Sequence, residues 1–194
     1  MSNKDQYLHV PYGQTVHGEE EIEAVVKVLR TSTQMGVNVR EFEQKVSDLY
    51  DKKHGVMVNS GSSALYLAID ILDLPKGCEV ITPALTFATT VSPLVKAGLI
   101  PAFVDNEPGT YNLDWRKVEE MITPKTKALW IPNLIGNLPD WKQLRAIADK
   151  YNLIVVEDSA DTLGAEIDGK SSGRFADMST TSFYGSHVIN CAGN

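Results

Sequence analysis

Three side chains that could do chemistry follow two expected strands late in the chain. Residues 153–156 form an uninterrupted apolar run that ends at Glu157 and Asp158, which is typical of a strand buried on both faces of a parallel sheet. A second expected strand, residues 179–184, is followed directly by Gly185, Ser186 and His187. Open α/β sheets bind ligands at the carboxyl ends of their strands, so we expect an acid, a hydroxyl and an imidazole to meet there. Taken singly, Asp158 could instead cap a helix, and His187 could be an ordinary solvated loop residue.

An anion-binding turn is expected earlier in the chain. Residues 55–58 are predicted to form a short strand, residues 59–63 read Asn-Ser-Gly-Ser-Ser, and a helix follows from Ala64. The free N–H groups and the dipole at a helix N-terminus favour a phosphate group at such a turn. The turn is neither a Walker loop nor a G-x-G-x-x-G motif. The alternative is that Ser62 or Ser63 only caps the helix.

Strand and helix patterns alternate along the rest of the chain. This order predicts an α/β fold, with a mostly parallel sheet covered by helices on both faces and with the strands at 153 and 179 near its centre. An amphipathic helix from residue 18 has Ile22, Val25, Val26 and Leu29 on one face. Further strands are expected at 79–83, 101–105 and 126–131, further helices at 39–52, 64–72, 86–97, 115–121 and 140–151, and a hairpin turn at 168–170.

Length and composition narrow the class of protein. The 194 residues suit one domain, and a net charge of -7 argues against a nucleic-acid partner. The sequence contains no apolar run long enough to span a membrane and no signal-peptide pattern at its start. Cys78 and Cys191 have neither a metal-ligand spacing nor a disulfide pattern, so no metal site and a reducing, cytoplasmic location are expected.

Several ordered blocks carry a resemblance to a known family. GEEEIEAVVKVLRT, NSGSSALYLAI, VITPALTFATTVSPLVKAG, VVEDSADTLGA and SFYGSH resemble the DegT-type sugar aminotransferases and dehydratases, which are pyridoxal phosphate enzymes of the aspartate aminotransferase fold. The resemblance runs the whole length of the chain. It implies that residues 1–194 hold an N-terminal segment and most of the large domain, whose mostly parallel seven-stranded sheet lies between helices. It also implies that the small C-terminal domain is absent from this chain.

The resemblance assigns seven residues to a site for pyridoxal or pyridoxamine 5′-phosphate. Asp158 would pair with the pyridine nitrogen, which keeps the ring protonated and makes it a better electron sink. Phe87 would stack on the ring. Ser62, the backbone N–H of Ser63, and Ser182 would hold the phosphate. The complete set is Gly61, Ser62, Ser63, Phe87, Asp158, Asp161 and Ser182.

Three positions depart from the aminotransferase pattern. His187 stands where the aminotransferases have the lysine that forms a Schiff base with the cofactor, and imidazole cannot form one. Asp161 replaces a usual Gln, and Asn133 stands where many relatives have His. These residues resemble the branch of 3-dehydratases that act on nucleotide-linked 4-keto-6-deoxyhexoses for lipopolysaccharide. The implied general base is His187, which would remove a proton from the C4′ carbon of the cofactor.

The resemblance also bears on clusters, partners and competing functions. The best-known member of the dehydratase branch has an iron–sulfur cluster, and Ala160 stands where its first cysteine falls, which argues against such a cluster here.

A homodimer is expected for the full-length protein, and a reductase partner is an option. Two alternatives stay open: a sugar aminotransferase whose lysine has been replaced, and a non-catalytic fragment that binds a ligand or a partner.

Overall fold

A five-stranded parallel sheet organises the protein, whose computed structural model describes residues 8–14 and 16–191. The strands lie in the order β2-β1-β3-β4-β7, and every neighbouring pair is parallel. The expected α/β fold with a mostly parallel sheet is therefore confirmed. The bounds are β1 Glu79–Pro83, β2 Ile100–Val104, β3 Thr126–Pro132, β4 Ile154–Ser159 and β7 Met178–Thr181.

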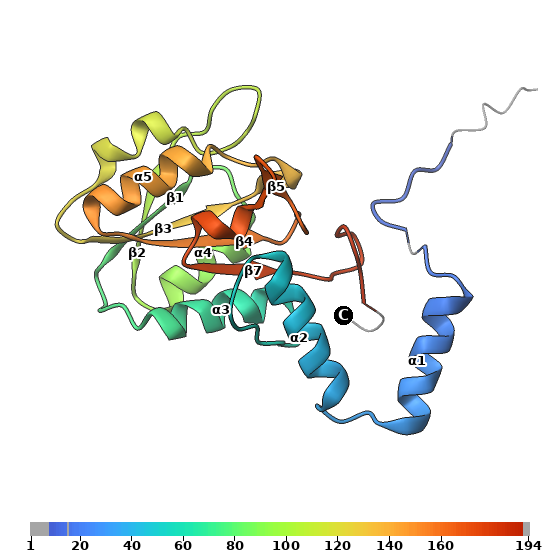
Figure 1. Ribbon diagram of the computed structural model, residues 1–194. Coiled ribbons are helices and arrows are strands. Elements are labelled where there is room, and N and C mark those ends of the chain that lie inside the picture. The colour runs from blue at the N-terminus through green and yellow to red at the C-terminus, as the bar shows by residue number, and fades with distance from the viewer. Residues whose placement is uncertain (1–7, 15, 192–194) are drawn as a thin grey trace, which may run out of the picture.

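Helices cover both faces of this sheet, as Figure 1 shows with α5 on one side and α3 and α4 on the other. Strand residues alternate between the two faces. Leu129 and Val155 pack in one apolar cluster with α5 (Trp141–Tyr151). Trp130 and Val156 pack in a second cluster with α3 (Gly61–Leu72) and α4 (Ala88–Lys96).

The same alternation separates the two acids at the end of β4. Because Val155 faces α5 and Val156 faces α3 and α4, the next residues, Glu157 and Asp158, point to opposite faces. Both are buried, Glu157 completely. The sequence placed both carboxylates together at the ligand-binding edge, but only Asp158 reaches it.

The first helix stands apart from this body. Helix α1 (Glu19–Thr31) buries none of its residues, and Figure 1 shows it beside the domain, joined through α2 (Val37–Leu49). The predicted apolar face is present, but Ile22, Val25 and Leu29 on it are exposed. The described residues therefore supply no cover for this face.

Local structure differs from the sequence expectations at several places. Residues 55–58 form no strand, because no other strand among the described residues pairs with them. β7 ends at Thr181, before Ser182, and lies at the edge of the sheet, whereas β4 is next to that edge. The expected helix at 115–121 is two short 3-10 turns, η1 (Trp115–Lys117) and η2 (Glu119–Met121). The described main sheet has five strands, compared with the seven that the resemblance implies.

The remaining short elements follow the expectations more closely. The predicted hairpin at 168–170 is confirmed as β5 (Glu166–Ile167) and β6 (Lys170–Ser171), joined through Asp168 and Gly169 with positive φ angles of 53° and 71°. Two further 3-10 turns are η3 (Leu134–Gly136) and η4 (Ser172–Phe175). Among the described residues no helix has the length and apolar character that a membrane crossing requires.

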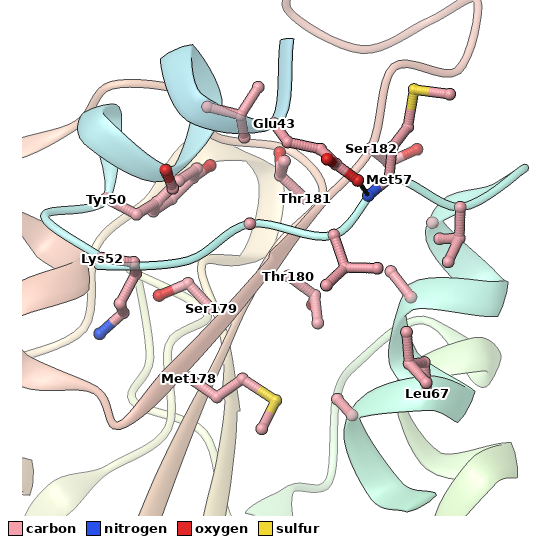
Figure 2. Close-up of a pocket in the computed structure, with 18 of the residues that line it drawn as sticks. Glu43, Tyr50, Lys52, Met57, Leu67, Met178, Ser179, Thr180, Thr181 and Ser182 are labelled. Atoms are coloured by element: carbon pink, nitrogen blue, oxygen red, sulfur yellow. Dashed lines mark hydrogen bonds between the residues drawn. The ribbon is translucent and has the colours of Figure 1, made fainter. Parts of the chain in front are cut away.

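An apolar cavity of about 320 Å³ lies along β7, between α2, α3 and residues 52–58. Figure 2 shows this cavity with Glu43, Tyr50, Lys52, Met57 and Met178 around it. The backbone N–H of Met57 donates to Glu43 Oε1 at 2.8 Å, which fastens the 52–58 segment to α2.

Candidate functional site

The larger cavity lies at the carboxyl ends of β3, β4 and β7 and has a volume of about 1060 Å³. Seven of the eight predicted cofactor and catalytic residues line it, and the exception is Ser63. The lining members of the predicted set are Gly61, Ser62, Phe87, Asp158, Asp161, Ser182 and His187. Residues from four separate parts of the chain therefore converge on one cavity.

Asp158 supplies a buried carboxylate at the floor of this cavity. Its Oδ2 accepts a hydrogen bond from Thr90 Oγ1 of α4 at 2.8 Å, and its Oδ1 accepts one from the Ala160 N–H at 3.3 Å. Burial raises the pKa of Asp158 from 3.8 to about 6, although both hydrogen bonds oppose that rise. The described residues give the ionised Asp158 carboxylate two neutral donors and no cationic partner. A cationic group on a ligand could therefore stabilise it.

The N-terminus of α3 forms another part of the lining. Ser60 caps the helix: its Oγ accepts from the Ser63 N–H at 3.1 Å. The alternative that Ser62 or Ser63 provides the cap is therefore wrong, and the Ser63 N–H is already engaged. The S-x-x-S spacing from Ser60 to Ser63 could have identified this cap from the sequence. Ser62 and Ser182 are left as the hydroxyls at this end.

His187 lies in the loop after β7 with only 17% of its side chain exposed. Its Nδ1 is buried and has no hydrogen-bond partner among the described residues. Its Nε2 lies 3.8 Å from Asp161 Oδ1, and the Tyr184 and His187 rings form a T-shaped pair with centroids 5.7 Å apart. The imidazole thus lines the cavity with one buried ring nitrogen that no described residue bonds.

Two further residues mark the mouth of the cavity. Phe87 precedes α4 and is 70% exposed, so its ring is available to a ligand in the cavity. The neighbouring Thr86 Oγ1 is buried and also has no hydrogen-bond partner among the described residues. A hydroxyl in that state can bond to a bound molecule without losing a protein contact.

Behind the cavity, Glu157 is the centre of a buried polar network that the sequence did not predict. Its Oε1 accepts from Asn133 Nδ2 at 2.8 Å, from Ser159 Oγ at 2.9 Å and from Ser172 Oγ at 2.6 Å. Its Oε2 accepts from Ser179 Oγ at 2.6 Å. The period-two alternation of β4 was the signal that could have placed Glu157 on this side.

Asn133 belongs to this network as well. Its Oδ1 accepts from Trp141 Nε1 at 2.9 Å, while its amide also donates to Ser159 Oγ at 2.7 Å. The side chain of Asn133 is therefore fully used in joining β3 to α5 and β4, although the residue lines the cavity.

The described residues offer no cluster of three or more His, Cys, Asp or Glu side chains that could hold a metal ion. Cys191 is exposed and Cys78 is partly buried. The groups that face the cavity suit different chemistry: a carboxylate for a cation, a helix N-terminus for a phosphate, and an imidazole for proton transfer.

Comparison with known proteins adds independent findings. Residues 15–194 match the model of the DegT/DnrJ/EryC1/StrS aminotransferase family. A GDP-perosamine synthase of Caulobacter vibrioides is 39% identical over 155 residues, which cover 80% of this chain and 42% of the relative. A GDP-4-keto-6-deoxy-D-mannose 3-dehydratase of Yersinia pseudotuberculosis is 34% identical over 189 residues, covering 94% and 48%. An Escherichia coli GDP-4-keto-6-deoxy-D-mannose-3-dehydratase structure with bound hydrated PLP is 33% identical with a TM-score of 0.88, covering 94% and 49%. The chain thus spans about half the length of the relatives it matches.

Proposed function

Because the chain belongs to the DegT/DnrJ/EryC1/StrS aminotransferase family, we propose that it forms the cofactor-binding part of a nucleotide-sugar 3-dehydratase. The substrate would be a nucleotide-linked 4-keto-6-deoxyhexose and the cofactor pyridoxamine 5′-phosphate. The observation that carries the proposal is His187, whose imidazole lines the same cavity as the buried Asp158 and whose Nδ1 has no hydrogen-bond partner within residues 8–14 and 16–191. An imidazole can move a proton near neutral pH but cannot bind the cofactor covalently as a lysine does.

The side chains of this cavity fit such a cofactor. A protonated pyridine nitrogen would give the Asp158 carboxylate the cationic partner that its burial calls for. The N-terminus of α3, with Ser62 and Ser182 beside it, suits the phosphate group. Phe87, exposed at the mouth, can cover a ring face. When bound, the cofactor would supply an electron sink for removal of the sugar's C3 hydroxyl.

Asp158, Thr90 and His187 have separate roles in this proposal. Asp158 keeps the pyridine nitrogen protonated, and Thr90 holds the carboxylate in place through its 2.8 Å hydrogen bond. His187 acts as the base that accepts a proton from the bound cofactor. The α4 N-terminus and the loop after β7 border the cavity in which these groups act.

A sugar aminotransferase is the second candidate, favoured by the similarity to a perosamine synthase. It would require an amino group to pass between the cofactor and two substrates without a lysine at position 187. A non-catalytic ligand-binding role is the third candidate. The proposed role in lipopolysaccharide sugar synthesis, a possible reductase partner and a cytoplasmic location rest on the resemblance.

We also propose that the full-length protein is a homodimer, as the resemblance implies. The exposed apolar face of α1, formed by Ile22, Val25 and Leu29, is consistent with further protein covering it. Sedimentation equilibrium of the cofactor-saturated protein tests this, and a fully active monomer would contradict it.

The function is tested by incubating the full-length protein and pyridoxamine phosphate with GDP-4-keto-6-deoxy-D-mannose, the sugar in the name of one relative. With pyridoxamine phosphate in excess as the two-electron donor, mass spectrometry should show loss of the C3 oxygen together with conversion of the cofactor to pyridoxal phosphate, without an amino-sugar product. Amino-sugar formation that depends on glutamate would support the second candidate instead. A folded protein that shows neither the cofactor's absorbance nor any turnover, with GDP- or CDP-linked sugars, would favour the third.

A further inference from the structure

Asp161 joins a strained turn to the imidazole of His187. Its Oδ2 accepts a hydrogen bond from the Ile135 N–H at 3.0 Å, and its Oδ1 lies 3.8 Å from His187 Nε2. These three residues follow β3, β4 and β7, which are neighbours in the sheet. The Asp161 carboxylate therefore faces both the loop after β3 and the loop after β7.

The turn at Ile135 fixes the orientation of this carboxylate. Ile135 has φ 51° and ψ 30°, in the left-handed region that β-branched residues rarely adopt. Its N–H points at Asp161 Oδ2 and engages that oxygen. Only Oδ1 is then left to face His187.

We propose that Asp161 is a positioning residue that sets the tautomer of His187, and that Nδ1 is therefore the base atom. In this arrangement the proton of the neutral ring is on Nε2, the nitrogen that faces Asp161 Oδ1 at 3.8 Å. A neutral imidazole carries one protonated and one free nitrogen, so Nδ1 keeps its lone pair. The catalytic consequence rests on the function proposed above.

The surroundings of the ring agree with this assignment. Nδ1 is buried with no hydrogen-bond partner among the described residues, whereas Nε2 faces a carboxylate. The Tyr184 and His187 rings pack in a T-shaped arrangement with centroids 5.7 Å apart. The separation of 3.8 Å is longer than a hydrogen bond, and catalytic hydrogen bonds that are long in a free protein commonly shorten when a substrate completes the site.

The proton step is balanced without another reactant. The proton of the cofactor's C4′–H bond would form a bond to Nδ1. The electron pair of that bond would remain on the C4′ carbon. The imidazole becomes cationic, and Asp161 Oδ1 stabilises the positive charge through the Nε2 proton. This division between base and orienting carboxylate is the same as in a hydrolase triad.

The substitution Asp161→Asn tests the assignment. An asparagine has one carbonyl oxygen, and if that oxygen keeps the Ile135 N–H, the amide NH₂ faces Nε2. Nε2 must then accept, so the proton moves to Nδ1 and blocks the base. We expect kcat for dehydration to fall about 100- to 10,000-fold, with KM changed much less.

The tautomer itself is read by ¹⁵N NMR of the histidine-labelled full-length protein, with His187→Asn used to assign the signals. We expect an Nε2-protonated ring in the wild-type protein and an Nδ1-protonated ring in Asp161→Asn. This measurement needs no turnover. A protein that shows the switch but does not dehydrate the sugar would refute only the proposed function.

A merely structural role for Asp161 is tested by Ile135→Gly. Glycine adopts the left-handed conformation without strain, so the turn no longer depends on the carboxylate. If Asp161 only holds the turn, Asp161→Ala, which removes the acceptor of the Ile135 N–H, should cost activity in the wild-type background but little in the Ile135→Gly background. Under our proposal the loss is as large there as in the wild-type background. Rescue by Ile135→Gly, an Nδ1-protonated wild-type ring, or an unchanged tautomer in Asp161→Asn would overturn the proposal.

Discussion

Gly61 and Ser182 approach each other more closely than any residue with a side chain at position 61 would allow. A Cβ atom on residue 61 would lie 2.7 Å from Ser182 Cβ and 2.9 Å from its Oγ. The contact joins the N-terminus of α3 to the loop after β7. It therefore fixes the spacing of the two elements that we assign to the phosphate.

The substitution Gly61→Ala should weaken cofactor binding while the domain stays folded. The added methyl must push Ser182 away from the helix end, and overpacking of this kind costs about 1–3 kcal/mol. We expect the Kd for pyridoxamine phosphate to rise roughly tenfold or more. Equilibrium dialysis or fluorescence titration of the full-length protein measures it.

Gly185→Ala is the matched control, because a Cβ atom there would meet nothing within 4 Å. Gly185 lies in the same loop and does not line the larger cavity. Its substitution should leave the Kd within twofold. Equal Kd values for Gly61→Ala and the wild-type protein would show that the phosphate does not bind at this junction.

The buried charge of Asp158 should make the cofactor-free protein less stable as the pH rises. The pKa of Asp158 is raised from 3.8 to about 6, so the folded state holds an extra proton between these values. The contribution is fully favourable below pH 4 and is lost as the pH rises through about 6. A shift of about two units corresponds to roughly 3 kcal/mol.

Urea unfolding of the wild-type protein and Asp158→Asn across this pH range measures the effect. The free energy of unfolding of the wild-type protein should fall relative to the variant between pH 4 and 6, then run parallel above pH 7. Cofactor affinity should do the opposite and increase with pH, because only the ionised carboxylate pairs with a pyridinium. A difference between the two proteins that does not vary with pH would contradict the buried charge.

The sequence predicted the parallel sheet because apolar runs, small turns and amphipathic helices alternate along the chain. It also brought Asp158 and His187 to one edge, because parallel strands end at the same side of a sheet, whereas Gly61 and Ser182 were assigned to the cavity only by the family resemblance. Contacts between loops were not predictable, since the approach of Asp161 to His187 depends on how two irregular segments fold. The strand expected at 55–58 also failed for a non-local reason, because a strand requires a partner.

Substitutions of His187 distinguish the proposed dehydratase from the other two candidate functions. His187→Asn should keep cofactor binding, because no predicted cofactor contact is removed, but lose C3 deoxygenation by about 100- to 10,000-fold. His187→Lys should permit a covalent link that borohydride reduction makes permanent and mass spectrometry detects. Exchange of the cofactor's C4′ proton with solvent reports directly on the base. Undiminished exchange in a folded His187→Asn protein would remove His187 from the mechanism.

Glu157 should support stability through its four hydrogen bonds rather than through contact with a ligand. Glu157→Gln keeps the size but replaces the oxygen facing Ser179 Oγ with an NH₂ group and removes the charge from the other three bonds. Bonds to a charged acceptor are worth more than neutral ones, so we expect a loss of about 1–3 kcal/mol in the free energy of unfolding. Glu157→Ala, which leaves buried donors unpaired, should cost about 3–5 kcal/mol.

Ser179→Ala is the control for this network, because it removes one donor and leaves the carboxylate with its other three. We expect it to cost about 1 kcal/mol in urea denaturation. If Glu157→Gln were as stable as the wild-type protein while Ser179→Ala were not, the charge on Glu157 would contribute nothing and the hydroxyl of Ser179 would act through another contact. The expected order of stability is wild type, Ser179→Ala, Glu157→Gln and Glu157→Ala. Ser179→Ala leaves no donor without the carboxylate, Glu157→Gln leaves the donors facing a neutral amide, and Glu157→Ala leaves them with no acceptor at all.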